Sequence, residues 1–187
     1  MNNEDDLSRT IDPNSDQLNA DDLVAGSMVI RIRDIKLTDG RDRPMWIYFY
    51  GDKNKPYKPN ITMRKLLIHA WGINRPEWIG RSMELYNDPE TKFGNQKVGG
   101  IKISRISHIT KDIRAMLQTT RGKRSEFVVG RLPSYPDADF AEKSPQWIAA
   151  IKAEKITLEE VIQKASVTGV LTKEQIEILK GAVNNGN

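Results

Sequence analysis

Apolar and polar residues alternate with a period of two along residues 45–50, which predicts a β-strand with two different faces. One face would carry Met45, Ile47 and Phe49, and the other Trp46, Tyr48 and Tyr50. The first set is typical of a core, whereas the second offers three rings with polar groups, a surface on which unpaired bases stack. Aromatic residues also favour strands in any protein, so a strand buried on both faces remains an alternative.

The segments on either side of this strand extend the pattern. Residues 27–36 alternate, with Met28, Ile30 and Ile32 on one side, and residues 38–42 have the composition of a turn. A polar loop over 51–60 follows the strand. Apolar residues then recur at helical spacing from Ile61 to Trp71 and stop at Gly72, which predicts a helix with a glycine C-cap.

Further strands are predicted over 81–87, 98–109 and 127–130, whereas residues 112–124 are open between a short helix and an extended loop. Five short strands with one helix between them predict a mainly β fold with some α structure. Over residues 25–131 we expect a five-stranded OB-like barrel with one inter-strand helix.

The two ends of the chain differ from this central domain. Residues 1–24 are polar and acidic without an apolar period, so we expect a disordered acidic arm. Residues 132–143 are typical of a linker. Residues 144–187 predict a small helical domain with a frayed tail, whose three helices begin near Ser144-Pro145, Thr157 and Thr172.

Charge is divided unevenly among these three parts. Residues 1–24 hold one basic and seven acidic residues, a net −6, and residues 25–143 hold 23 basic and 13 acidic residues, a net +10. Residues 144–187 hold five of each and are neutral. The central domain therefore attracts polyanions, of which nucleic acid is the commonest, although phospholipid or an acidic protein would respond to the same field.

Composition narrows the function classes. The chain has no cysteine and only two histidines, which excludes disulfides, thiolate metal sites and all-histidine metal sites, and we expect no cofactor. No apolar run is long enough to span a membrane, and the acidic start does not resemble a signal peptide. These features favour a cytoplasmic protein.

Three motifs carry a resemblance to a known group. They are Lys58-Pro59-Asn60-Ile61-Thr62, the run from Glu77 to Tyr86 that contains Trp78-Ile79-Gly80-Arg81, and Phe93-Gly94 followed by Gly100-Ile101-Lys102-Ile103. Over about residues 28–106 the chain resembles small bacteriophage and prophage proteins that are similar to OB-fold single-stranded DNA-binding proteins. The resemblance implies a phage protein that binds single-stranded DNA in a bacterial host cell and acts in replication, recombination or repair. The chain lacks the acidic, Phe-ended tip through which cellular single-strand binders recruit partners.

The candidate nucleic-acid-binding residues are rings and cations on the outward faces of the predicted strands, together with two basic loops. They are Arg31, Arg33, Trp46, Tyr48, Tyr50, Lys53, Lys55, Lys58, Tyr86, Lys102, Arg121, Lys123 and Arg124. Stacking contributes about 1 to 3 kcal/mol per base, and the cations add a salt-dependent term. We assign Trp71 and Trp78 to the core.

Two other classes of function remain. Glu90-Thr91-Lys92 matches half of a metal-dependent nuclease signature, but no acidic partner lies upstream on a strand, so we expect no catalytic residues. The second class is a phage-encoded interaction protein or inhibitor that docks on a host or phage enzyme through the barrel and the helical tail. Residues 144–180 could also bind a replication or recombination protein.

Overall fold

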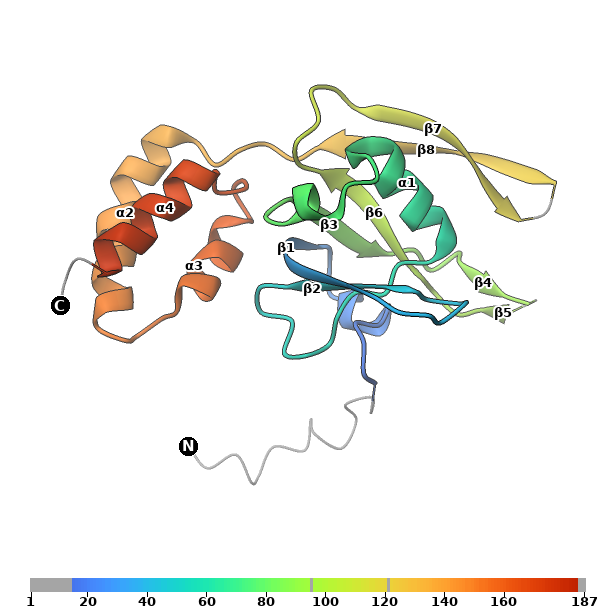
Figure 1. Cartoon of the computed structure of the whole chain (residues 1–187), viewed down its shortest axis with the longest axis horizontal. Coiled ribbons are helices and arrows are strands. Elements are labelled where there is room, and N and C mark those ends of the chain that lie inside the picture. The colour runs from blue at the N-terminus through green and yellow to red at the C-terminus, as the bar shows by residue number, and fades with distance from the viewer. Residues whose placement is uncertain (1–14, 95, 121, 185–187) are drawn as a thin grey trace.

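A computed structural model describes residues 15–94, 96–120 and 122–184. In this part of the chain the fold is mixed α and β, with a six-stranded open sheet and four α-helices (Figure 1). The strands of the sheet lie in the order β2-β1-β3-β6-β8-β7, and all neighbours are antiparallel except β6 and β8. They are β1 (Met28–Leu37), β2 (Met45–Phe49), β3 (Ser82–Asn87), β6 (Ile101–Ile106), β7 (Ile113–Thr120) and β8 (Lys123–Arg131).

The first strand is shared between two pairs. Its first half pairs with β3, from Met28 opposite Leu85 to Arg31 opposite Ser82, and its second half pairs with β2. The register with β2 shifts between Ile32 and Asp34, which marks a bulge. The bulge allows one strand to bend and to join both halves of the sheet.

The predicted helix is confirmed as α1 (Ile61–Trp71), and its ends follow local rules. The side chain of Asn60 accepts a hydrogen bond from the Met63 N–H, and Gly72 follows the last turn with a φ of 79°. The buried residues Met63, Leu66, Leu67 and Trp71 join the sheet core. In Figure 1 this helix lies between the β1–β2 pair and the β7–β8 pair, and it contacts β7.

The expected five-stranded barrel needs correction in one respect, because the described residues form an open six-stranded sheet. The sixth strand is β7, in a segment for which we predicted a short helix or a loop. Its inward residues Ile113, Ala115 and Leu117 alternate with Arg114, Met116 and Gln118, but the pattern is weak because Met116 is exposed. Pairing with β8 along its length supplies the backbone hydrogen bonds that stabilise it.

The acidic arm also needs correction. Residues 1–14 lie outside the described residues, and residues 15–24 do not form the disordered segment that we expected. Leu18 and the 3₁₀ turn η2 (Asp21–Leu23) pack on the sheet domain, with Leu18 and Leu23 buried in its core. The Leu18 N–H also donates to the Pro56 carbonyl. Two leucines within six residues are sufficient to anchor a segment that is otherwise polar.

The C-terminal part forms a second core of its own. It contains α2 (Asp137–Lys152), α3 (Leu158–Ala165) and α4 (Lys173–Asn184), packed around Phe140, Val161 and Leu179. Thr157 caps α3 in a capping box, as its sequence predicts. The prediction for α2 was wrong, because the helix begins at Asp137 inside the expected linker and Pro145 lies within it. Asp137 and Asp139 in its first turn and the buried Phe140 favour the earlier start.

Short elements complete the described chain. A 3₁₀ turn, η3 (Arg75–Trp78), precedes β3, and a small hairpin is formed by β4 (Lys92–Phe93) and β5 (Gln96–Lys97). Trp71 and Trp78 are 4% and 2% exposed and meet edge to face, which confirms their assignment to the core.

Candidate nucleic-acid interface

The outer face of the β1–β2 pair is where the structure places most of the predicted rings. On β2, Ile47 and Phe49 are buried in the core, whereas Trp46 and Tyr48 are only partly buried. Tyr50, just beyond the strand, is also partly buried. The alternation predicted for residues 45–50 is therefore confirmed, and the ring-bearing face is not covered by a second layer of core.

Trp46 lies among cations. The Lys58 ammonium is 4.0 Å from the centre of its ring and the Lys36 ammonium is 5.3 Å from it. The indole N–H donates to the Arg43 carbonyl at 3.1 Å, which fixes the orientation of the ring. A ring held in place beside ammonium groups combines the two components of single-strand binding, a stacking surface and a nearby positive charge.

Lys58 lies in one of the two predicted basic loops, but its side chain does not extend into solvent. Its side chain is 7% exposed, and its ammonium contacts the Asp16 carboxylate at 2.7 Å. This hydrogen bond from Lys58 lowers the pKa of Asp16. The loop is ordered here because Tyr57 is buried and exchanges backbone hydrogen bonds with Ile47 on β2. Lys58 therefore supports Trp46 from the core side, and the packed arm neutralises its charge.

Tyr48 and Arg33 form the next part of this face. The Arg33 guanidinium lies 5.8 Å from the Tyr48 ring centre, and its Nη2 donates to the Asp52 carboxylate at 2.9 Å. The buried Asp52 also accepts hydrogen bonds from the Phe49 and Asn54 N–H groups, so it holds the turn after β2. The arginine is thereby pre-positioned beside the ring, while half of its side chain stays exposed.

An open groove of about 610 Å³ runs along this face. Its lining includes Arg33, Lys36, Tyr48, Asn54 and Arg75. Sequence reasoning missed Lys36 and Arg75. The bulge in β1 turns Lys36 toward the ring side, opposite Trp46, and the spacing of Ile30, Ile32 and Ile35 is the signal that an extra residue interrupts the alternation. No comparable signal marks Arg75.

The two lysines in the turn after β2 have different surroundings. Lys53 is exposed, and both it and Asn54 adopt a positive φ, 48° and 63°. Lys55 is half-buried. Lys53 is therefore the predicted loop lysine that is most open to solvent.

Arg31 and Tyr50 lie apart from the groove, at the other end of the β1–β2 pair. Arg31 Nη1 donates to the Leu171 carbonyl of the helical unit at 2.6 Å. Both side chains line a separate cavity between the sheet and that unit. Arg31 and Tyr50 are therefore separated from the rings and cations that line the groove.

Tyr86 and Lys102 form a third group. They lie opposite each other on β3 and β6, and β1 separates these two strands from β2. The Lys102 ammonium pairs with the Asp88 carboxylate at 2.5 Å and lies 5.7 Å from the Phe127 ring centre. Because its charge is already compensated, Lys102 is a weaker candidate for phosphate binding than Lys36.

The second predicted basic loop is the tip of the β7–β8 hairpin, which extends away from the core in Figure 1. Arg124 is exposed near this tip. Arg121 lies outside the described residues, and Lys123 is described only as the first residue of β8. The hairpin therefore carries a cation beyond the body of the domain.

The nuclease alternative finds no structural support in the described residues. The Glu90 carboxylate pairs with Lys97 at 2.8 Å, and Lys92 belongs to the small β4–β5 hairpin. Over the described ranges, no group of three or more His, Asp or Glu side chains could hold a metal ion.

Among the described helices, none is both long and apolar enough to cross a bilayer.

Comparison with known proteins identifies no relative: no protein-family model, no curated protein and no solved structure matches this chain.

Proposed function

We propose that this chain is a non-enzymatic, single-stranded nucleic-acid-binding protein of phage origin. Single-stranded DNA is the expected ligand, and replication, recombination or repair in the bacterial cytoplasm is the expected setting. The observation that carries the proposal is the outer face of the β1–β2 pair, where Trp46 and Tyr48 each lie beside a cation and Tyr48 borders an open groove. Bases would stack on the rings while Arg33, Lys36 and Arg75 pair with the phosphates.

The strand pairing supports an OB-like interpretation of the sheet. Taken in chain order, the five strands β1, β3, β6, β7 and β8 pair as first-second-third-fifth-fourth, with the third and fifth parallel. An OB barrel has the same strand order, and it is closed by pairing of its first strand with its fourth. We propose that the domain is an open OB-like barrel in which β2 is an added strand and α1 lies between the two edges.

The proposal is tested by fluorescence anisotropy of a labelled single-stranded oligonucleotide across a salt series, with duplex as competitor. Affinity should fall with salt, and the duplex should compete poorly because its base faces are hidden. Replacing Trp46 or Tyr48 with Ala should weaken binding about five- to hundredfold. This loss should persist at high salt, whereas the loss caused by Lys36→Ala should shrink there.

Tryptophan fluorescence provides a matched control. Trp71 and Trp78 are buried, so quenching on binding should come from Trp46. Trp46→Phe should abolish the quenching yet keep most of the affinity, because phenylalanine still stacks. Trp147→Phe, in the helical unit, should change neither the quenching nor the affinity. Absence of binding at low salt, or equal losses from Trp46→Ala and Lys36→Ala at every salt concentration, would contradict the proposal.

A second function is favoured by one apolar patch. Leu37, Ile68 and Ile73 are 57%, 41% and 89% exposed and border a small apolar hollow of about 100 Å³. Exposed apolar side chains gathered at one place are typical of a protein contact. The alternative is therefore an interaction protein or inhibitor that docks on an enzyme. Under this alternative, Ile73→Ser would leave oligonucleotide binding unchanged and weaken the protein complex.

A further inference from the structure

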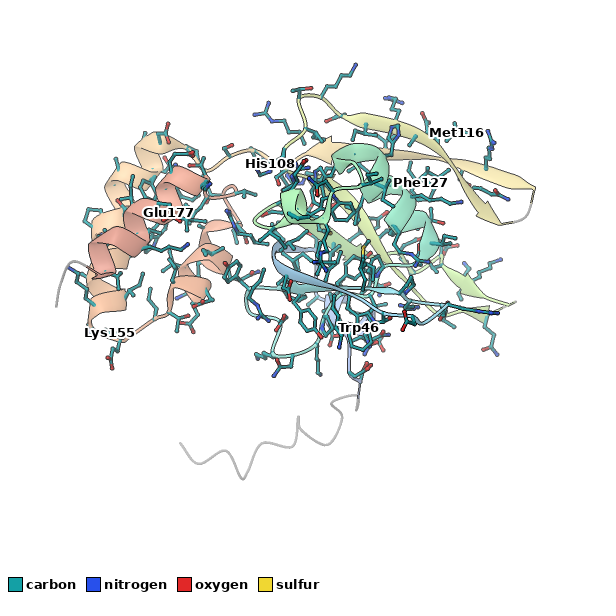
Figure 2. The ribbon with its side chains drawn as sticks, in the orientation of Figure 1. Trp46, His108, Met116, Phe127, Lys155 and Glu177 are labelled. Atoms are coloured by element: carbon teal, nitrogen blue, oxygen red, sulfur yellow. The ribbon has the colours of Figure 1, made fainter. Side chains whose placement is uncertain are left out.

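A cavity of about 860 Å³ lies between the sheet domain and the helical unit. Its sheet side includes Arg31, Tyr50 and His108, and its helical side includes Lys173 and Glu177. Figure 2 labels His108 on the sheet side and Glu177 on α4, across the space that separates the two parts. The volume is within the usual range for small-molecule sites.

The charge on the walls of this cavity is predominantly positive. Four cations line it, Arg31, Arg131, Lys173 and Lys180, against the two carboxylates Glu174 and Glu177. Glu177 is already paired with Lys180 at 3.0 Å. Arg31, Arg131 and Lys173 make no ion pair within the described part of the chain. The walls therefore have positive charge available for an anionic ligand.

Arg31 is the best placed of these cations. Its guanidinium is largely buried, and burial lowers its pKa. Among the described residues its side chain makes one hydrogen bond, from Nη1 to the Leu171 carbonyl. A guanidinium has five N–H donors in a planar fork that matches phosphate, so most of the recognition capacity of Arg31 is unused. The side chain also lies against Gly80, where an added Cβ would be 3.6 Å from Nη2.

His108 places a ring nitrogen beside these cations. The Ser107 hydroxyl accepts a hydrogen bond from the Ser82 N–H and lies 2.8 Å from His108 Nδ1, so one ring nitrogen is held by a hydrogen bond to Ser107. In the tautomer that carries its proton on Nε2, Nδ1 accepts from Ser107 and Nε2 is a donor. His108 has a φ of 59°, an uncommon conformation that often occurs at binding sites. Burial and the positive Arg81 and Arg31 side chains lower the pKa of His108.

We propose that this cavity is a phosphate-binding site for a nucleotide, with Arg31 and Lys173 as the main cations and Tyr50 beside them as a surface for the base. The nucleotide would be either free or the terminal unit of a single strand, since both present the same phosphate. The inference extends the proposed function to a second binding region, but the phosphate site itself does not depend on the rings at Trp46 and Tyr48. A bound phosphate would also bridge the sheet and the helical unit.

The test is an NMR titration of the full chain with thymidine monophosphate, thymidine and inorganic phosphate. The monophosphate and the inorganic phosphate should shift the amide signals of His108, Leu171 and Lys173, and thymidine should not. Arg31→Gln should weaken monophosphate binding about tenfold, and Arg31→Lys, which keeps the charge, should weaken it less. Lys155→Ala, on the exposed loop labelled in Figure 2 far from His108, is the matched control and should have no effect.

Folding is controlled with a second variant. Lys173→Ala leaves the Arg31–Leu171 hydrogen bond intact. It should therefore weaken binding of the monophosphate several-fold without loosening the helical unit. Equal shifts from thymidine and its monophosphate, or full affinity in both Arg31→Gln and Lys173→Ala, would overturn the proposal. Competition by a polyglutamate peptide without competition by phosphate would overturn it in favour of an acidic protein partner.

Two comparisons separate this inference from the proposed function. Trp46→Ala should leave monophosphate binding unchanged. The phosphate site would therefore be supported even if long oligonucleotides failed to bind. Oligonucleotide binding to the ring face would likewise be supported even if the monophosphate failed to bind. Oligonucleotides with a 5′-phosphate and a 5′-hydroxyl then distinguish the two sources. A gain in affinity from the 5′-phosphate that disappears in Arg31→Gln assigns the site to strand ends, whereas monophosphate binding without that gain assigns it to free nucleotides.

Discussion

Glu84 shows how strongly the role of one side chain depends on its neighbours. It lies on the outward side of β3, yet its side chain is only 10% exposed. Arg105 donates two hydrogen bonds to its carboxylate, each 2.7 Å long, and the Ser27 hydroxyl donates a third at 3.0 Å. The hydrogen bonds from Arg105, together with those from the Ser104 and Ser27 hydroxyls, lower the pKa of Glu84 to about 2.

This pKa gives a prediction for stability against pH. A carboxylate whose pKa is lower in the folded state stabilises the fold above its unfolded pKa, near 4.3, and loses that effect as the pH falls toward 2. Glu84→Gln should therefore lower the free energy of unfolding by about 1 to 2 kcal/mol at pH 7. This value is smaller than the pKa shift alone would give, because solvent screens the partly exposed Arg105. The difference from the wild type should narrow as the pH falls from 4 to 2, measured by urea denaturation.

Glu126 provides the control for that measurement. Its carboxylate lies 3.5 Å from Arg114, and both side chains are more than half exposed. Glu126→Gln should change the free energy of unfolding by less than about 0.5 kcal/mol at any pH. A pH-independent cost for Glu84→Gln would mean that lost packing, rather than charge, accounts for its effect.

Among the elements, α1 is the one whose local signals are strongest. Asn60 caps its first turn through a hydrogen bond to the Met63 N–H at 3.0 Å, and the apolar residues recur on one side. We expect Asn60→Ala to lower the free energy of unfolding by about 1 kcal/mol, because that N–H loses its partner. Chemical denaturation followed by circular dichroism measures this change.

Asn74 is a matched control for Asn60. It precedes the 3₁₀ turn η3 without making a side-chain cap, and its amide instead contacts the exposed Glu77. Asn74→Ala should therefore cost less than about 0.5 kcal/mol. If both variants cost the same, the cap at Asn60 does not contribute to the stability of α1.

The β7 strand and helix α2 show where local signals fail. The alternation in β7 includes an exposed methionine, so a strand cannot be told from a helix or a loop until its partner β8 is known. In α2, Ser144-Pro145 has the form of a helix start, but the buried Phe140 and the contact with α4 extend the helix toward its N-terminus. In both cases tertiary packing overrides a local preference.

Across the domain, the packed part of the N-terminal arm joins distant segments. Leu23 lies in the same core as the sheet, and Asp16 pairs with Lys58, which in turn lies against Trp46. The acidic arm therefore contacts the same lysine that supports the ring face. This places negative charge beside the surface that we propose binds nucleic acid.

The arm's contribution to stability is testable with adjacent residues. Leu23 is 3% exposed, so Leu23→Ala should lower the free energy of unfolding by about 2 kcal/mol or more through the cavity it leaves. Val24 is 71% exposed, and Val24→Ala should have little effect. Urea denaturation followed by tryptophan fluorescence compares the two. Equal stability of both variants would show that this segment does not contribute to the core.

Local chemistry along the chain was enough to predict α1 with both of its ends, the capped start of α3, and the two faces of β2. These features depend on residues within four positions of one another, through helical spacing, caps and strand alternation. The rings at Trp46 and Tyr48 were found in this way. By contrast, pairings between distant segments decided that Lys58 is buried and that Arg31 faces Leu171. No local period records such contacts, since they form only when the chain folds back on itself.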